Sequence, residues 1–525
     1  MKYATPFRCL GPRLRNSRLV PGLLAATMLA GCMVGPDYHR PAAISPAMLK
    51  EMTPPPGWAF ADPHYAELPK GAWWTLYNDP VLTGLESQID VSNQTIKADE
   101  AAYRQARALV DEARAGLFPT ITATPSFTRS GTGTSSSGGS IGAGSSTLTG
   151  AGVGGGSSEF DRTSYELQGS VDWQIDVWGQ IRRQVESSAA AAQVSAATLA
   201  AARLSIQTTL ATDYFELRYE DSLQTLLDKF VTYYTQAEVI TRNSTNAGVS
   251  APSDLLQAEV QLETTRAQSV AVGIARAQYE HAIAVLTGHP PSDLSLTPGA
   301  LTTTIPAIPV TVPSQVLQRR PDIAEGERTM EEENALIGVA IAAYYPVISL
   351  SAAAGYAGDP LGSLIKVANR FWSLGATAVQ TLFNGGERSA AVRAARAVYD
   401  ESVANYRQTV LAAFQSLEDD LSNLRILARE SDAQVRADEL SDEAVRVAFN
   451  EYTAGTTIYT TVITSQTTAL SNDETELSIQ ENRVLASVSL INDLGGGWNA
   501  SDIPSKASYQ TDDPFLPSFI QKDRN

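Results

Sequence analysis

Residues 164–175 read Ser-Tyr-Glu-Leu-Gln-Gly-Ser-Val-Asp-Trp-Gln-Ile, and a proline-free helical pattern follows over about 180–246. In 164–175, apolar residues and one Gly occupy the odd positions and polar residues the even ones. This is the pattern of a β-strand that faces lipid on one side and water on the other. At about 1.5 Å per residue, roughly 67 helical residues make a rod of about 100 Å. The stretch therefore predicts a membrane strand that leads directly into a very long helix.

Three further segments extend the period-two pattern, at about 120–129, 346–356 and 371–380. Any one of them could belong to a soluble sheet, but all four adjoin long helices, which a soluble sheet explains less well. Known membrane barrels have at least about eight strands, because every backbone group in lipid must be paired. Four strands therefore predict a barrel shared between copies. Two copies would give eight strands and three would give twelve, and the arithmetic does not choose between them.

The chain is an internal duplication. The aligned positions are Gly179 with Gly385, Ala247-Gly248 with Ala454-Gly455, and Gly288 with Gly495, at offsets of 206, 207 and 207 residues. Upstream the offset widens to 227, because Phe118-Pro119 corresponds to Tyr345-Pro346. The extra residues lie in 130–158, where 24 of 29 residues are Gly, Ser or Thr. This composition is typical of a flexible loop, which we interpret as an external loop of the barrel.

Each half holds a long and a shorter helical stretch, at about 180–246 and 252–288 and at about 386–453 and 457–495. In the second long stretch, apolar residues recur at alternating spacings of four and three, the seam of a coiled coil. They are Val410, Phe414, Leu417, Leu421, Leu424 and Ala428, and Leu210, Tyr214 and Leu217 precede three of them by 207 residues. A soluble bundle would show the same periodicity, but the helix length and the neighbouring strands favour a continuation of the barrel.

The N-terminus predicts a lipoprotein signal. Five basic residues and no acidic one accompany the apolar run 19–30, which ends in Leu29-Ala30-Gly31-Cys32. Basic, apolar and then small residues form a secretory signal, and a Cys at this point is the acceptor of diacylglycerol. The alternatives are a chance Cys or a membrane anchor, although the apolar run is too short to span a bilayer comfortably. We expect cleavage of 1–31 and lipidation of Cys32.

Composition excludes several functions. The chain carries a net charge of −18, and loss of the signal leaves 34 basic against 57 acidic residues, a charge of −23 that disfavours nucleic acid as a partner. The two cysteines, Cys9 and Cys32, leave no disulfide or thiolate metal site in a mature monomer. Beyond the signal we find no apolar stretch of transmembrane-helix length, so β-strands would have to cross the membrane.

Nothing in the sequence predicts catalysis. The four histidines show no metal-ligand spacing, and the Gly-rich loop lacks the Lys and helix start of a phosphate-binding loop. Carboxylate pairs such as Asp419-Asp420 lie on a long polar helix, where a solvated face is the usual explanation. We therefore predict no enzyme activity, no metal and no cofactor other than the covalent lipid on Cys32.

Four motifs, in this order, resemble the outer membrane factor family of TolC-like exit ducts, and within it the NodT-type efflux lipoproteins. They are Cys32-Met33-Val34-Gly35-Pro36-Asp37-Tyr38 with Arg40-Pro41, Trp73-Trp74 with Asp79-Pro80, Arg319-Arg320-Pro321-Asp322, and Gly495-Gly496-Gly497-Trp498. The resemblance implies an α+β membrane protein: a homotrimer with a twelve-stranded outer-membrane barrel, a long periplasmic α-helical barrel and a mixed equatorial belt.

On this basis we divide the chain into a signal peptide, an anchored segment, two repeats, a linker and a tail. The signal peptide is 1–31 and the anchored segment is 32–78. The two repeats are 79–288 and 313–497, the linker between them is 289–312, and the tail is 498–525. Each repeat is expected to hold two of the strands and one helical hairpin, with hairpin tips near 248 and 455.

The resemblance also implies which residues meet partners. The tips, which would receive a periplasmic membrane fusion (adaptor) protein, are Ala247, Gly248, Val249 and Ser250 and Ala454, Gly455, Thr456 and Thr457. A hairpin tip needs a Gly whether or not a partner binds. The gate at the periplasmic mouth would comprise Ser253, Asp254, Tyr452, Thr461 and Thr464. Thr457 stands where relatives carry Arg, and Thr461 and Thr464 where they carry acids, which leaves Asp254 to Tyr452 as the chief polar link.

We therefore predict an outer-membrane channel through which a resistance-nodulation-division (RND) pump of the inner membrane expels drugs or other small molecules. The alternative is the same duct in a type I protein or peptide secretion system. A trimeric coiled-coil adhesin fits less well, because such proteins keep their anchor strands together at the C-terminus and lack a lipoprotein signal.

Overall fold

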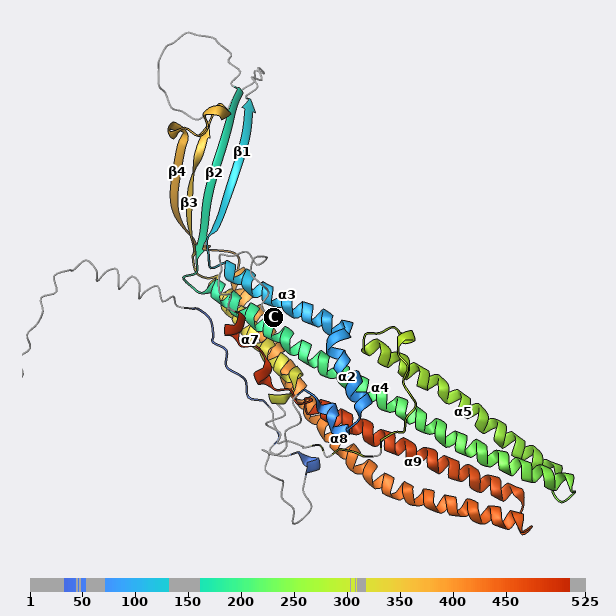
Figure 1. The fold of residues 1–525 in the computed structure, drawn as a ribbon. Helices are drawn as coiled ribbons and strands as arrows, with labels where there is room; N and C mark the ends of the chain where they lie inside the picture. The colour runs from blue at the N-terminus through green and yellow to red at the C-terminus, as the bar shows by residue number, and fades with distance from the viewer. Residues whose placement is uncertain are drawn as a thin grey trace, which may run out of the picture.

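A computed structural model describes residues 33–43, 46, 49–52, 71–131, 161–302, 304–306, 308 and 318–509. The predicted signal 1–31, Cys32, most of the loop 130–158, part of the linker 289–312 and the tail after 509 lie outside the described residues. In Figure 1, a slender sheet stands at one end of the molecule and two long helical hairpins reach away from it. Shorter helices pack around the hairpins between these two ends.

The sheet has four antiparallel strands in sequence order. They are β1 (Thr120–Gly131), β2 (Asp161–Ile175), β3 (Val347–Gly358) and β4 (Arg370–Val379). The register pairs Phe127 with Tyr165, whose ring centroids lie 5.1 Å apart, on the apolar face. On the polar face, the hydroxyls of Thr122 and Ser170 lie 2.6 Å apart. One face is therefore apolar and the other polar, and β1 and β4 are unpaired edges within the chain.

Two helices of 67 residues each, α4 (Gln180–Asn246) and α8 (Glu387–Thr453), form the first arms of the hairpins. Each begins after a Gly with left-handed backbone, Gly179 or Gly386. The return arms, α5 (Pro252–Leu286) and α9 (Tyr459–Asp493), have 35 residues each. The matching lengths show the duplication directly. α4 packs against α5 and α9, and also against α3 (Gln94–Ala115) and α7 (Pro321–Ala342).

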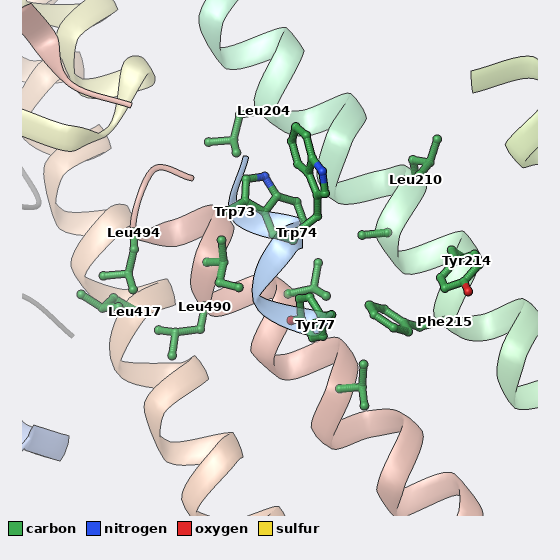
Figure 2. Packing of buried hydrophobic residues seen from close by; sticks show 14 of the residues in the cluster. Trp73, Trp74, Tyr77, Leu204, Leu210, Tyr214, Phe215, Leu417, Leu490 and Leu494 are labelled. Atoms are coloured by element: carbon green, nitrogen blue, oxygen red, sulfur yellow. The ribbon is translucent and has the colours of Figure 1, made fainter. Parts of the chain in front are cut away.

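The core lies where α4, α8 and α9 meet the 3-10 helix Trp73–Tyr77, close to α2 (Pro80–Ser92) (Figure 2). Tyr77 lies 4.9 Å from Phe215, centroid to centroid, and its hydroxyl lies 2.6 Å from Ser487 Oγ. The upper part of the predicted seam enters this core: the buried members are Leu210, Tyr214, Leu217, Val410, Phe414 and Leu417. Leu421 and Leu424 pack against the core while half-buried. The Trp73-Trp74 motif thus has a packing role.

The Arg-Arg-Pro-Asp motif joins the start of α7 to the end of α9. Pro321 is the first residue of α7, and the Arg320 guanidinium lies 3.0 Å from the Asp493 carboxylate and 2.7 Å from that of Asp322. A side chain at Gly495 would collide with the carbonyl of Arg319. This explains why glycine follows α9 at the point where the two segments meet.

One sequence expectation was wrong. α4 is, by length and composition, apolar enough over one 18-residue window to cross a membrane, with a mean hydropathy of 1.2. We had expected no such stretch after the signal. The cause is its alanine-rich composition, since alanine raises hydropathy while its small side chain lets neighbouring helices approach closely. In this fold, α4 packs along other helices of the same chain, and 28% of that window is buried.

Candidate functional site

The two hairpin tips have the same backbone geometry. Gly248 and Gly455 adopt left-handed φ values of 73° and 74°. After Gly248, the Val249 N–H donates to the Ser244 carbonyl at 2.9 Å, and the Thr456 N–H donates to the Glu451 carbonyl at 2.9 Å. These are the C-terminal capping bonds that let a helix end on glycine and the chain reverse.

The tips form an exposed surface in the protomer. Six of the eight predicted tip residues are exposed, and Ser250 and Thr457 are half-buried. Val249 is 82% exposed. A side chain added at Gly248 or Gly455 would meet no atom within 4 Å. The tips are therefore apolar or small-residue surfaces to which a partner has unobstructed access in a single chain.

The predicted Asp254 to Tyr452 link does not form among the described residues of one protomer. The Tyr452 hydroxyl instead lies 3.4 Å from Ser250 Oγ, and its ring packs 5.2 Å from that of Tyr459. Asp254 occupies the first turn of α5 and is half-buried, with no side-chain hydrogen bond there. Ser250 precedes α5 and meets the tyrosine first, which leaves Asp254 one turn beyond it. Burial, with the charge of Asp254 as a smaller cause, raises the pKa of Tyr459 to about 12.

The remaining gate candidates are uncharged. Thr457 donates to Thr461 at 3.2 Å, and Thr464 donates to the carbonyl of Thr460 at 2.9 Å. Thr461 and Thr464 are exposed, as is Ser253 at the start of α5. Because these side chains are uncharged, and Thr457 and Thr464 donate to neighbouring residues of their own segment, this part of the mouth carries few polar links.

Sequence reasoning missed two contacts that join neighbouring arms near the tips. Arg242 of α4 donates to Glu238 at 2.6 Å and to Glu259 of α5 at 3.2 Å. Thr460 of α9 donates to Gln257 of α5 at 3.4 Å. The spacing of Glu238 and Arg242, four residues apart on one helix, was the available signal for the first of these.

A carboxylate cluster lies nearer the core, on α4 and α9. Burial, followed by the charges of Glu216 and Glu220, raises the pKa of Glu481 to about 7. Burial, followed by Glu216, raises the pKa of Asp213 to about 6. Tyr279 of α5 hydrogen-bonds to Glu216, which raises the tyrosine pKa. The cluster therefore holds more protons in the folded chain near pH 6 than in an unfolded one.

This cluster predicts that the folded protein loses stability as pH rises. A carboxyl with a raised pKa binds more protons when folded, so stability falls between the unfolded pKa of about 4.5 and the folded value of about 7. We expect Glu481→Gln to raise the melting temperature at pH 8 by about 1–2 °C and to change it little at pH 4.5. Differential scanning fluorimetry at both pH values measures this, and an equal shift at both would contradict it.

The first described residues form a strap, defined here as 33–38, across the junction of β2 with α4. The Val34 N–H donates to the Trp178 carbonyl at 3.1 Å. Arg183, whose side chain is 1% exposed, donates to the carbonyls of Val34 and Gly35 at 3.3 Å and to Asp37 at 2.9 Å. Together with Glu186 of α4, whose carboxylate lies 2.7 Å from the Arg183 guanidinium, the strap satisfies a buried cation that would be costly to leave unpaired at this depth.

Close glycine contacts hold the strap in place. A side chain at Gly35, whose φ is +99°, would lie 2.5 Å from the Gly338 backbone, and one at Gly179 would lie 2.7 Å from Met33. The ring of Trp178 stacks on that of Tyr345 at 4.8 Å, and its N–H donates to the Pro346 carbonyl at 2.9 Å. Because Val34 bonds to the Trp178 backbone, the start of the strap lies beside this aromatic pair, next to the sheet. Sequence reasoning did not single out Arg183 or Gly338.

Comparison with known proteins identifies the family and the fold of the chain. The sequence matches the family model described as "Outer membrane efflux protein" over residues 85–289 and 312–496. This chain belongs to the outer membrane efflux protein family. The two matched ranges fall one in each half of the duplication.

Curated relatives agree with this assignment. The chain is 26% identical to the probable efflux pump outer membrane protein TtgC of Pseudomonas putida, over 90% of this chain and 94% of that protein. It is 27% identical to nodulation protein T of Rhizobium leguminosarum bv. trifolii, over 82% and 87%. The predicted resemblance to NodT-type outer membrane efflux proteins is confirmed.

Solved structures share the fold. The outer-membrane channel OprN superimposes with a TM-score of 0.77 at 27% identity, covering 89% of this chain and all of that one. The CmeC outer membrane channel of Campylobacter jejuni gives 0.80 at 20% identity, covering 91% and 97%. The predicted fold class is confirmed: the chain has the fold of an outer-membrane channel subunit, a four-stranded antiparallel sheet continued by a long helical extension. Its confirmed function is transport through an efflux channel, which involves no catalysis.

Proposed function

We propose that this efflux channel is a lipid-anchored homotrimer that receives a periplasmic adaptor protein at its tips and serves an RND-type inner-membrane pump. The observation that carries the proposal is the pair of equivalent, exposed tips at the end of the molecule opposite the sheet (Figure 1). With the sheet in the outer membrane, the tips are the part of the chain that reaches deepest toward the inner membrane. A type I secretion duct would present the same tips and remains the second candidate.

The strand count supports assembly of several copies, and the size of the lumen favours three. Four strands per chain leave β1 and β4 with unpaired backbone groups, which lipid does not tolerate. Three copies give twelve strands and a wider lumen than two copies would, and a wide lumen suits a duct for small molecules. The proposed repeats, 79–288 and 313–497, would each contribute two strands and one hairpin to every subunit.

The strap supports lipidation of Cys32. Met33, the next residue, lies against Gly179, the residue that precedes α4 just after β2. A lipid on Cys32 would therefore start at the level where the sheet gives way to the periplasmic helices, which is where the inner leaflet of the outer membrane would lie. Outer-membrane lipid is thus a proposed partner of the chain at this point.

At the mouth, we assign Asp254 a partner in a neighbouring copy. Its carboxylate has no side-chain hydrogen bond within the described protomer, while Tyr452 is engaged by Ser250. Ser253, Thr461 and Thr464 would line the same mouth without adding charge. An acid in the first turn of α5 also favours the helix dipole, which is the structural alternative to a gate.

The most direct test is a pull-down of the tagged protein from membranes, followed by mass spectrometry. We expect one adaptor, one RND-type pump and three copies of this chain per complex. Recovery of an ABC-type transporter would support the secretion duct instead. A folded monomer in native mass spectrometry of the detergent-solubilised protein would contradict the proposed assembly.

The anchor predicts two separable defects. Cys32→Ser should abolish labelling by tagged palmitate and reduce recovery in the outer-membrane fraction, because the lipid is attached through the thiol. Gly35→Val should keep the label but displace the strap, since its side chain would meet the Gly338 backbone at 2.5 Å from a left-handed conformation. Overpacking and backbone strain together cost about 2–4 kcal/mol, measurable as a lower melting temperature. Equal labelling of Cys32→Ser would refute the anchor.

A further inference from the structure

An open cavity of about 520 Å³ lies between the two long hairpin arms, toward the tips. Its walls come from α4 and α8, and α9, which packs against both, forms its floor (Figure 1). The lining includes Tyr233 of α4, Glu439, Asp442 and Phe449 of α8, and Gln466 of α9. All three helices belong to one chain, so the cavity is complete without a second copy. Its size is that of sites that hold drug-sized molecules.

The floor of this cavity holds a hydrogen-bond acceptor that lacks a donor. Gln466 is only 5% exposed, and its side-chain oxygen has no hydrogen-bond partner among the described residues. A buried carbonyl oxygen without a donor is unfavourable, and folded proteins hold few of them. Because Gln466 lines the cavity, a ligand that brings an N–H group to this side chain would satisfy it.

The equivalent position in the first hairpin carries its own cation. Gln466 corresponds to Glu259 of α5 at the offset of 207 residues. At the same offset, Phe449 corresponds to Arg242 of α4. In the first hairpin, Arg242 and Glu259 form an ion pair at 3.2 Å. The second hairpin has a phenyl ring and an amide instead, so it keeps an acceptor but lacks the guanidinium. This difference favours a cation from outside the chain at the place that Arg242 fills in the first hairpin.

The charges that line the cavity are mostly negative. Glu439, Asp442 and Glu443 lie on α8 together with one cation, Arg446. Arg446 donates to Glu443 at 2.9 Å, so these two charges offset each other. Glu439 and Asp442 are exposed and make no ion pair among the residues that the structure describes. Two unpaired carboxylates beside one cavity attract cations and repel anions.

Aromatic rings contribute to both walls of the cavity. Tyr233 of α4 is 46% exposed, and Phe449 of α8 is half-buried. The Lys229 ammonium lies 5.8 Å from the centroid of the Tyr233 ring, so this ring already takes part in a cation–π contact. Lys229 itself lies 3.7 Å from the Asp473 carboxylate, so that pair adds no net charge beside the cavity. Exposed aromatic faces next to unpaired acids suit a ligand that is both aromatic and positively charged.

We propose that this cavity binds an aromatic organic cation that carries an N–H donor. Glu439 and Asp442 supply the opposite charge, Tyr233 and Phe449 pack against the ligand rings, and the side chain of Gln466 accepts the N–H. The ligand thereby makes up for the cation that the second hairpin lacks. Such binding requires neither the adaptor nor the pump, so this inference is independent of the partners proposed above.

Proflavine, a planar aromatic cation with two amino groups, is a direct probe. Its fluorescence anisotropy, titrated with the purified protein in a non-ionic detergent, should show saturable binding. Phe449→Arg with Gln466→Glu rebuilds the Arg242–Glu259 pair of the first hairpin at this position without changing the net charge. This double variant should weaken proflavine binding about tenfold, because its own guanidinium takes the place of the ligand. Absence of saturable binding to the wild-type protein, or equal affinity of the double variant, overturns the proposal.

A second pair of variants separates this site from general attraction to an acidic chain. Glu439→Gln with Asp442→Asn removes the two unpaired acids and should also lower the affinity about tenfold. Glu430→Gln with Asp432→Asn removes two exposed acids of the same helix outside this cavity, so the affinity should stay within about twofold of wild type. All four positions are exposed, so the melting temperatures should change little. An equal loss of affinity in both double variants would show non-specific attraction and overturn the site.

Discussion

Gly248→Trp or Gly455→Trp should abolish drug efflux while leaving the yield of assembled channel near normal. Both glycines sit at exposed reversals with no atom within 4 Å of an added side chain, so the indole adds bulk outside the fold. Strain at a left-handed φ costs about 1–2 kcal/mol, a tolerable fraction of a large core. The added bulk would block the surface that we assign to the adaptor. Minimum inhibitory concentrations in a strain lacking the native channel measure the loss, which we expect to be complete.

Two controls separate docking from folding in this experiment. Gly248→Asn keeps a residue that tolerates the left-handed conformation and adds little bulk, so efflux should persist. Gly362→Trp adds the same indole at the opposite end of the molecule, also with no atom within 4 Å, and should leave efflux intact. Normal export by either tip Trp variant would show that the adaptor does not dock there.

The parts of the fold that the sequence predicted are those with a local signature. Alternation over 164–175 is a property of one strand, and β2 occupies Asp161–Ile175. The long helices and their reversals were equally visible, because uninterrupted helix formers and a single Gly determine a hairpin without reference to the rest of the chain. The offset of 207 residues between the two halves predicted the position of the second hairpin from that of the first. α4 and α8 are of equal length, as this duplication requires.

Contacts between distant segments could not be read in this way. The strap depends on Arg183 meeting carbonyls about 150 residues away, and no local pattern reveals that pairing. The Asp254 to Tyr452 link failed within the protomer for a related reason: the rotation of two hairpins about their axes decides whether Ser250 or Asp254 meets the tyrosine. Residue type predicts which side chains lie at the mouth, whereas the rotation of the helices decides which of them meet.

The proposed partner of Asp254 in a neighbouring copy would make this residue more sensitive to substitution than a bond within the protomer would. We expect Asp254→Ala to raise single-channel conductance in planar bilayers severalfold and to sensitise cells to a large antibiotic such as vancomycin. The reason is that the proposed carboxylate hydrogen bond between copies would be strong and directional, and threonines at 457, 461 and 464 supply no charge to replace it.

The controls for Asp254→Ala decide between a gate and a helix cap. Thr464→Ala removes a hydroxyl that already bonds within its own helix, so conductance should stay near wild type. Asp254→Asn keeps the side-chain shape while removing the charge that favours the start of α5, and it should open the channel partly if the charge closes the mouth. A cap alone predicts a lower melting temperature with unchanged conductance in both Asp254 variants. A gate role changes the conductance, whereas a cap role changes only the melting temperature. A destabilised but closed channel would therefore refute the gate hypothesis and leave Asp254 with a structural role in the first turn of the returning helix.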